Sequence, residues 1–152
     1  MRLTRNFSLE QLIFSETALR VGIDNAPAPD IVKNLRLLAK GLEKVQALTG
    51  FPLAISSGYR CPELNRRVGG AKTSQHTLGL AADFTCAEFG SPVDIIKAIR
   101  EAGIKFDQCI LEYGRWVHLS FSKEPRGKLL TIYDPKAGYL DGLRDKGGKE
   151  IA

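Results

Sequence analysis

Three side chains with metal-binding chemistry stand in two short segments of the sequence. His76 and Asp83 are separated by six residues, and His118, the second and last histidine, lies 35 residues beyond Asp83. Two imidazoles and one carboxylate form a ligand set of the kind that catalytic zinc sites use, with a fourth position left for water. Zinc lowers the pKa of such a water towards about 7 and polarises carbonyl groups, which is what amide hydrolysis requires. The alternative is that both histidines serve packing and that Asp83 is a hydrogen-bonded carboxylate.

Secondary-structure elements must position these residues. Along the sequence, helices are predicted first and strands mixed with one helix follow, an order that is typical of an α+β domain. Apolar residues recur at steps of four and three over 30–48, which predicts an amphipathic helix that Gly50 ends. Capping signals at Ser8, Ser15 and Ser91 predict three more helices, the last ending at Gly103. Strands are expected at 52–56, 80–85, 106–113, 116–121 and 128–133, with the third and fourth joined as a hairpin.

The composition fits one domain with its own core. The chain has 152 residues, of which 43% are hydrophobic, and no apolar run is long enough to suggest a membrane span. We divide it into a domain of residues 1–133, with a helical part at 8–50 and a metal-site part at 51–133, and a polar tail at 134–152. The net charge of +5 suits an anionic partner such as a cell wall, but no Lys/Arg run indicates nucleic-acid binding.

Three stretches of the sequence follow the pattern of a known family. They are Ser57-Gly58-Tyr59-Arg60, Ser74-Gln75-His76-Thr77-Leu78-Gly79-Leu80-Ala81-Ala82-Asp83 and Trp116-Val117-His118. In these the chain resembles the zinc D-Ala-D-Ala carboxypeptidase family, which includes phage endolysins with L-alanyl-D-glutamate endopeptidase activity and shares its fold with the hedgehog signalling domain. The resemblance runs from about Asn6 to Phe121. It implies an α+β fold, an antiparallel sheet with helices packed on it, and zinc bound at the sheet by His76, Asp83 and His118.

The resemblance also implies substrate contacts. Arg60 matches the arginine that holds a substrate carboxylate or the charged tetrahedral intermediate, and a guanidinium offers such an oxyanion a two-pronged hydrogen bond. Ser74 and Gln75 precede the first ligand and are expected to bind substrate or to orient His76. For Ser74, a role as a loop or cap residue is equally consistent with the sequence.

The general base is the point where this sequence departs from the family. Many members carry an acid three residues before the last histidine, but that position is Arg115 here, which cannot accept a proton. We predict that Glu112, on the other arm of the hairpin, is the base. A two-residue hairpin loop would put Glu112 on the face opposite His118, whereas a three-residue loop would bring both onto one face. Asp107, at the start of the same strand, is the second candidate.

These features predict a zinc metallopeptidase that hydrolyses amide bonds in peptidoglycan stem peptides, as a D,D-carboxypeptidase or an endopeptidase of phage or prophage lysis type. The alternative is a non-catalytic, zinc-containing module that binds cell wall or builds a virion. We expect a monomer without nucleic-acid partners. The first residues show no apolar stretch of signal-peptide type. The protein is therefore expected to be made in the cytoplasm and to act on the wall after phage lysis or as part of a virion.

Overall fold

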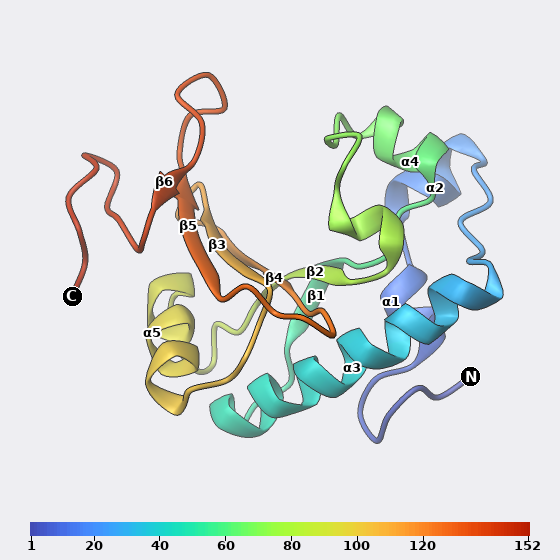
Figure 1. Ribbon diagram of the computed structural model, residues 1–152. Helices are drawn as coiled ribbons and strands as arrows, with labels where there is room; N and C mark the ends of the chain where they lie inside the picture. Colours follow the sequence, from blue (N-terminus) through green and yellow to red (C-terminus); the bar gives the residue numbers. More distant parts are fainter.

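A six-stranded sheet runs through the centre of the structure, a computed structural model that describes residues 1–152 (Figure 1). Its strands lie in the order β1-β2-β4-β3-β5-β6. They are β1 (Ala54–Ser57), β2 (Ala81–Thr85), β3 (Gln108–Glu112), β4 (Trp116–Ser120), β5 (Lys128–Ile132) and β6 (Leu140–Asp141). All five strands expected from the sequence are present, and the α+β class is confirmed.

The sheet is mixed rather than wholly antiparallel, because β3 and β5 run parallel. Because β4 is antiparallel to β3, β4 ends beside the start of β3. The connection over 121–127 crosses at this end of the sheet, so β5 begins beside the start of β3 and runs in the same direction. Asp107 holds the connection there: its carboxylate accepts hydrogen bonds from the backbone N–H and the guanidinium of Arg126, at 2.7–3.0 Å. Four of the five strand pairings are antiparallel, as the resemblance predicts, and the β3–β5 pairing is the exception.

Five α-helices and one 3-10 helix surround the sheet. They are α1 (Leu9–Ile13), α2 (Glu16–Val21), α3 (Pro29–Thr49), α4 (Pro62–Arg67), the 3-10 helix η1 (Gln75–Leu78) and α5 (Pro92–Ala102). The side chains of Ser8, Ser15 and Ser91 cap α1, α2 and α5 as predicted, and Gly50 ends α3 in the left-handed conformation. The short α4 and η1 were not predicted.

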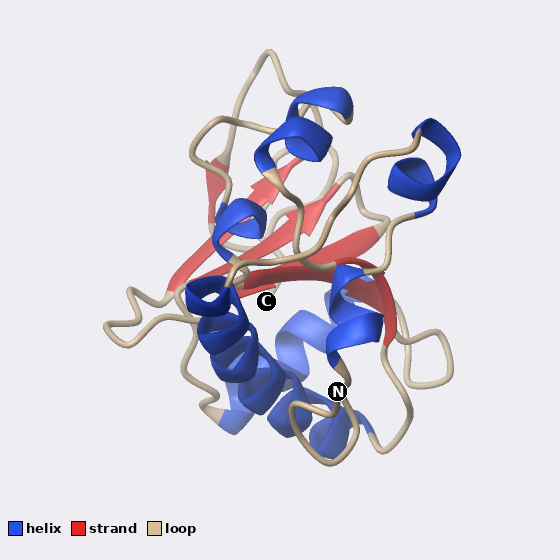
Figure 2. Ribbon diagram, turned by 90° about the vertical axis from the view of Figure 1, so that its right-hand side faces the viewer, coloured by secondary structure: helices blue, strands red, loops and turns tan.

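The helices form two unequal layers. The long helices α3 and α5 cover one face of the sheet, whereas α2, α4 and η1 lie on the other side (Figures 1 and 2). The strands send Phe84, Leu111, Val117 and Leu119 into a continuous core with α3 and α5, where all four are fully buried. Because side chains alternate along a strand, the neighbours of these core residues point to the opposite face, which carries the candidate site.

Residues 134–152 do not trail from the domain as the expected polar tail. They contribute β6, which pairs with β5, and they bury Leu143 in the core. The backbone N–H of Arg144 donates to Thr131 Oγ1, and the hydroxyl of Tyr133 donates to the Arg144 carbonyl. One buried leucine and a few hydrogen bonds are enough to hold a segment whose average composition is polar.

Candidate metal centre

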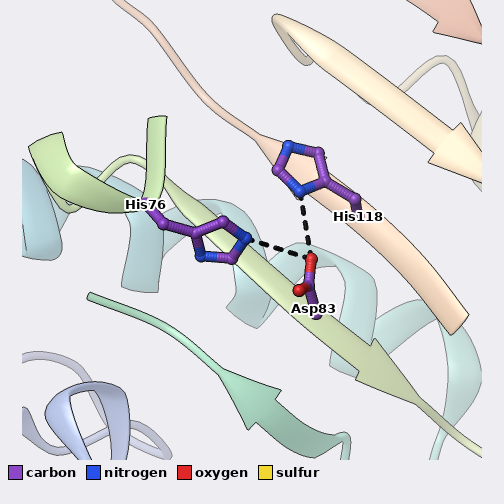
Figure 3. Close-up of side chains that lie close together, drawn as sticks. All are labelled: His76, Asp83 and His118. Atoms are coloured by element: carbon purple, nitrogen blue, oxygen red, sulfur yellow. Dashed lines mark hydrogen bonds and ion pairs between the residues drawn. The ribbon is translucent and has the colours of Figure 1, made fainter. Parts of the chain in front are cut away.

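The three predicted ligands converge on the face of the sheet opposite α3 and α5. The potential ligand atoms of His76, Asp83 and His118 all lie within 4.8 Å of one another. Asp83 on β2 and His118 on β4 are direct partners in the strand register, so their side chains share a face. Asp83 Oδ1 lies 3.2 Å from His76 Nε2 and 3.0 Å from His118 Nδ1 (Figure 3).

Two hydrogen bonds orient His76, one at its backbone N–H and one at its imidazole ring. Ser74 Oγ accepts a hydrogen bond from the His76 backbone N–H, so Ser74 caps the 3-10 turn. The imidazole Nδ1 lies 2.7 Å from the carbonyl oxygen of Gly58. Since a carbonyl oxygen only accepts, Nδ1 carries a proton, and Nε2 is the ring nitrogen that faces Asp83. A histidine that donates from one ring nitrogen to a carbonyl and presents the other is the usual arrangement of a metal ligand.

The electrostatics of Asp83 also fit a metal ligand. Burial alone would raise the pKa of this carboxyl, but hydrogen bonds with His118 and His76 outweigh burial and hold the pKa well below its usual range. Asp83 is therefore ionised at any ordinary pH. One ionised carboxylate and two imidazole nitrogens match the donor set that zinc prefers. The residues present fit a zinc ion.

The hairpin between β3 and β4 has the three-residue loop that brings Glu112 to the ligands. Glu112 pairs with Trp116, and the loop contains Tyr113 and Gly114 in the left-handed region, with φ of 57° and 65°. Glu112 Oε1 lies 3.7 Å from His118 Nδ1. Burial raises the pKa of Glu112, and the charge of Asp83 raises it further. The structure thus places a carboxyl with a raised pKa beside the ligands, on their face of the sheet.

Arg60 enters the site from the edge of β1. Its backbone N–H donates to the carbonyl of His76 at 3.1 Å, which ties the segment after β1 to η1. Burial lowers the pKa of the guanidinium, while the charges of Asp83 and Glu112 act in the opposite direction. An arginine remains protonated in any such environment. Its Nε is buried and has no hydrogen-bond partner in the protein.

Asp107 and Gln75 contact each other rather than the ligand cluster. Gln75 Nε2 donates to Asp107 Oδ2 at 2.8 Å, and the same carboxylate is paired with Arg126. Asp107, the second candidate for the base, is therefore committed to holding the β4–β5 connection and η1. The substrate contacts predicted for Ser74 and Gln75 stay predictions, since both side chains have structural partners here.

The sequence did not predict two contacts near the site. The Gly58 carbonyl that orients His76 is a backbone group, and the only signal for it was the glycine of the Ser57–Arg60 stretch. The pairing of Asp107 with Arg126 joins residues 19 apart across a parallel strand crossover, and no local pattern indicates it.

Imidazole and carboxylate groups that meet beside a second, largely buried carboxyl can support metal-assisted hydrolysis, and all four groups lie on one face of the sheet. This class agrees with the sequence comparison. Residues 5–120 match the model of the Peptidase M15 family, and the chain belongs to that family of zinc D-Ala-D-Ala carboxypeptidase-type metallopeptidases. No curated protein matches the sequence. None of the helices has the length and apolar character needed to cross a membrane.

Proposed function

We propose that the protein is a zinc-dependent peptidase that hydrolyses an amide bond in peptidoglycan stem peptides. The observation that carries the proposal is the convergence of His76, Asp83 and His118 within 4.8 Å, with Glu112 on the same face. Membership of the M15 family supports peptidoglycan as the substrate class. A net charge of +5 suits an enzyme that must approach an anionic wall.

The roles of the residues follow from their chemistry. A zinc ion held by the three ligands supplies Lewis acidity towards a carbonyl and lowers the pKa of water. Glu112 accepts the proton of the attacking water and returns it to the leaving amine, and its raised pKa brings it closer to the working range of a general base. Arg60 binds the oxygen on which negative charge develops, or a terminal carboxylate of the substrate, through its guanidinium.

Two finer assignments belong to the same proposal. The bond cleaved is either the terminal D-Ala-D-Ala bond or an internal bond of the stem peptide. We place the enzyme in phage or prophage lysis because the opening segment, Phe7 to Ala18, resembles short and often phage-borne members of the family.

Mass spectrometry of digested peptidoglycan tests the proposal and identifies the bond. Purified sacculi are incubated with zinc-loaded protein, with chelated protein and with protein to which zinc has been restored. We expect release of D-alanine or of shortened peptides with the first and third samples only. Glu112→Gln, folded and zinc-loaded, should release almost nothing.

The competing function is a zinc-containing module that binds wall or virion without turnover. It is favoured by Arg115, which occupies the position where many family members carry the acid. A folded, zinc-loaded protein that co-sediments with sacculi but releases no product would contradict the peptidase and support this module.

A further inference from the structure

The face of the sheet that carries the ligands continues past Glu112 towards the opposite edge. Glu112 pairs with Ile132 of β5, and Thr131 of β5 pairs with Leu140 of β6. Continuing the β5–β6 register by one residue brings Tyr139 beside Ile132. Side chains alternate along a strand, so this continued register would put Tyr139 on the face of Glu112, with Leu140 on the opposite face.

Tyr139 is a large side chain left open to solvent at this edge. Its exposed fraction is 57%, and it belongs to the connection between β5 and β6. In Figure 1 this connection is the loop that rises above β5 and β6. Tyr133, by contrast, uses its hydroxyl to hold the C-terminal segment through the Arg144 carbonyl.

The charges of the candidate site act on the Tyr139 phenol. Partial burial raises the pKa of Tyr139, and the charge of Glu112, the phenol of Tyr113 and the charge of Asp83 raise it further. A phenol with a raised pKa keeps its proton at any working pH and is a hydrogen-bond donor. A donor next to two carboxylates suits a substrate group that accepts, such as a peptide carbonyl.

Tyr139 and Arg60 flank the ligands from opposite edges of the sheet. Arg60 follows β1, Asp83 and His118 lie on the next two strands, and Glu112 and Tyr139 follow across β3, β5 and β6. Both Arg60 and Tyr139 are within reach of the charges of Asp83 and Glu112. An extended peptide laid across the strands over the ligands would therefore meet Arg60 on one side and Tyr139 on the other.

We propose that Tyr139 is a substrate-binding residue, whose hydroxyl donates a hydrogen bond to the backbone of the stem peptide on the side of the ligands opposite Arg60. The proposal rests on the proposed peptidase function and adds a contact to it. Residue 139 lies outside the residues that match the family model, so the contact is provided by the C-terminal segment of this chain.

Three variants test this contact. Tyr139→Phe removes only the hydroxyl, Tyr139→Ala removes the ring as well, and Leu140→Ala is the matched control at the neighbouring, oppositely facing and also exposed position. The probe is a synthetic stem pentapeptide ending in D-Ala-D-Ala, or the sacculus fragment that the enzyme cleaves. Thermal unfolding establishes that all three variants are folded.

A neutral hydrogen bond contributes about 0.5–1.5 kcal/mol, so Tyr139→Phe should lower kcat/KM by about 2–12-fold. The loss should fall on KM, because the contact is made equally in ground and transition states. Tyr139→Ala should lose more, and Leu140→Ala should match the wild type. Wild-type values of kcat/KM in both Tyr139 variants would overturn the proposal, and a loss in Tyr139→Ala alone would overturn the hydrogen bond.

A binding measurement separates this proposal from the peptidase function. The Kd of the same peptide is measured by calorimetry for zinc-loaded Glu112→Gln, with and without Tyr139→Phe. If the wild type hydrolyses nothing, the proposed function fails, and the binding experiment still decides on Tyr139. Weaker binding with Tyr139→Phe supports the contact, and an unchanged Kd overturns it.

Discussion

Replacing Gly58 by alanine is expected to weaken zinc binding through a backbone contact, without touching any ligand. The carbonyl oxygen of Gly58 lies 2.7 Å from His76 Nδ1 and fixes the orientation of that ring. Gly58 is also packed against α1: a Cβ added to it would lie 2.2 Å from the carbonyl oxygen of Leu12. That same oxygen accepts a hydrogen bond of 2.7 Å from the Tyr59 backbone N–H, which holds the two segments together.

The size of the effect follows from these distances. Ordinary van der Waals contact begins at 3.4 Å, whereas the added methyl carbon would lie 2.2 Å from the Leu12 oxygen. The two atoms must therefore move about 1.2 Å further apart. A shift of about 1 Å in the Gly58 carbonyl would take its distance to His76 Nδ1 beyond the range of a hydrogen bond. Loss of such a supporting contact lowers metal affinity by about 10–100-fold, and the overpacking costs about 1–3 kcal/mol of unfolding free energy.

Competition with a chromophoric zinc chelator measures the affinity, and urea unfolding of the zinc-free protein measures the stability. Gly147→Ala is the matched control, because Gly147 also lacks a positive φ and an added Cβ there would lie 3.4 Å from its nearest neighbour. If Gly58→Ala bound zinc as tightly as the wild type, the role given to the Gly58 carbonyl would be refuted.

Three further predictions concern single side chains. Glu112→Gln should keep zinc and lose about 10²–10⁴-fold in kcat, measured on released product, because it removes the proton acceptor. Arg60→Ala should keep zinc and lose about 10²–10³-fold in kcat/KM, with little rescue in Arg60→Lys, since an ammonium lacks the planar fork; near-normal rates in both would make Arg60 structural. Asp107→Asn should lower the unfolding free energy at pH 7 by about 1–2 kcal/mol, a modest value because Arg126 is half exposed. Hydrogen bonds from Arg126 lower the pKa of Asp107 from 3.8 to about 2, so this difference should persist above pH 4 and vanish as the pH falls through 2 in zinc-free protein.

The elements with strong local signals were predictable from the sequence. The apolar period and Gly50 predict α3 to within one residue at each end, since both signals act within a few turns of one helix. No local pattern indicates the parallel pairing of β3 with β5, because the contacts at the start of these strands, such as the pair of Asp107 with Arg126, join residues far apart in the sequence. The burial of Leu143 was not predicted either, because a single apolar residue in a polar segment forms no helical or strand-like hydrophobic pattern.

The site shows the same division. The residue types and spacing of His76, Asp83 and His118, together with the family resemblance, predict a three-residue metal site, and the structure brings these side chains together. For Glu112 the sequence left two hairpin loops open, and the structure adopts the one in which Tyr113 takes a positive φ, a conformation that residue type alone does not indicate. The carbonyl of Gly58 and the approach of Tyr139 depend on how segments distant in sequence meet.

The most direct test of the account is the metal content of the purified protein. Elemental analysis after supply of zinc and removal of the excess should find about one zinc ion per wild-type chain, as expected for a three-ligand site. His118→Ala, confirmed as folded by circular dichroism, should retain little or none, because His118 supplies one of the three converging atoms. A folded wild-type protein that contains no zinc after this treatment, or a His118→Ala variant that keeps it fully, would contradict the assignment of the metal centre.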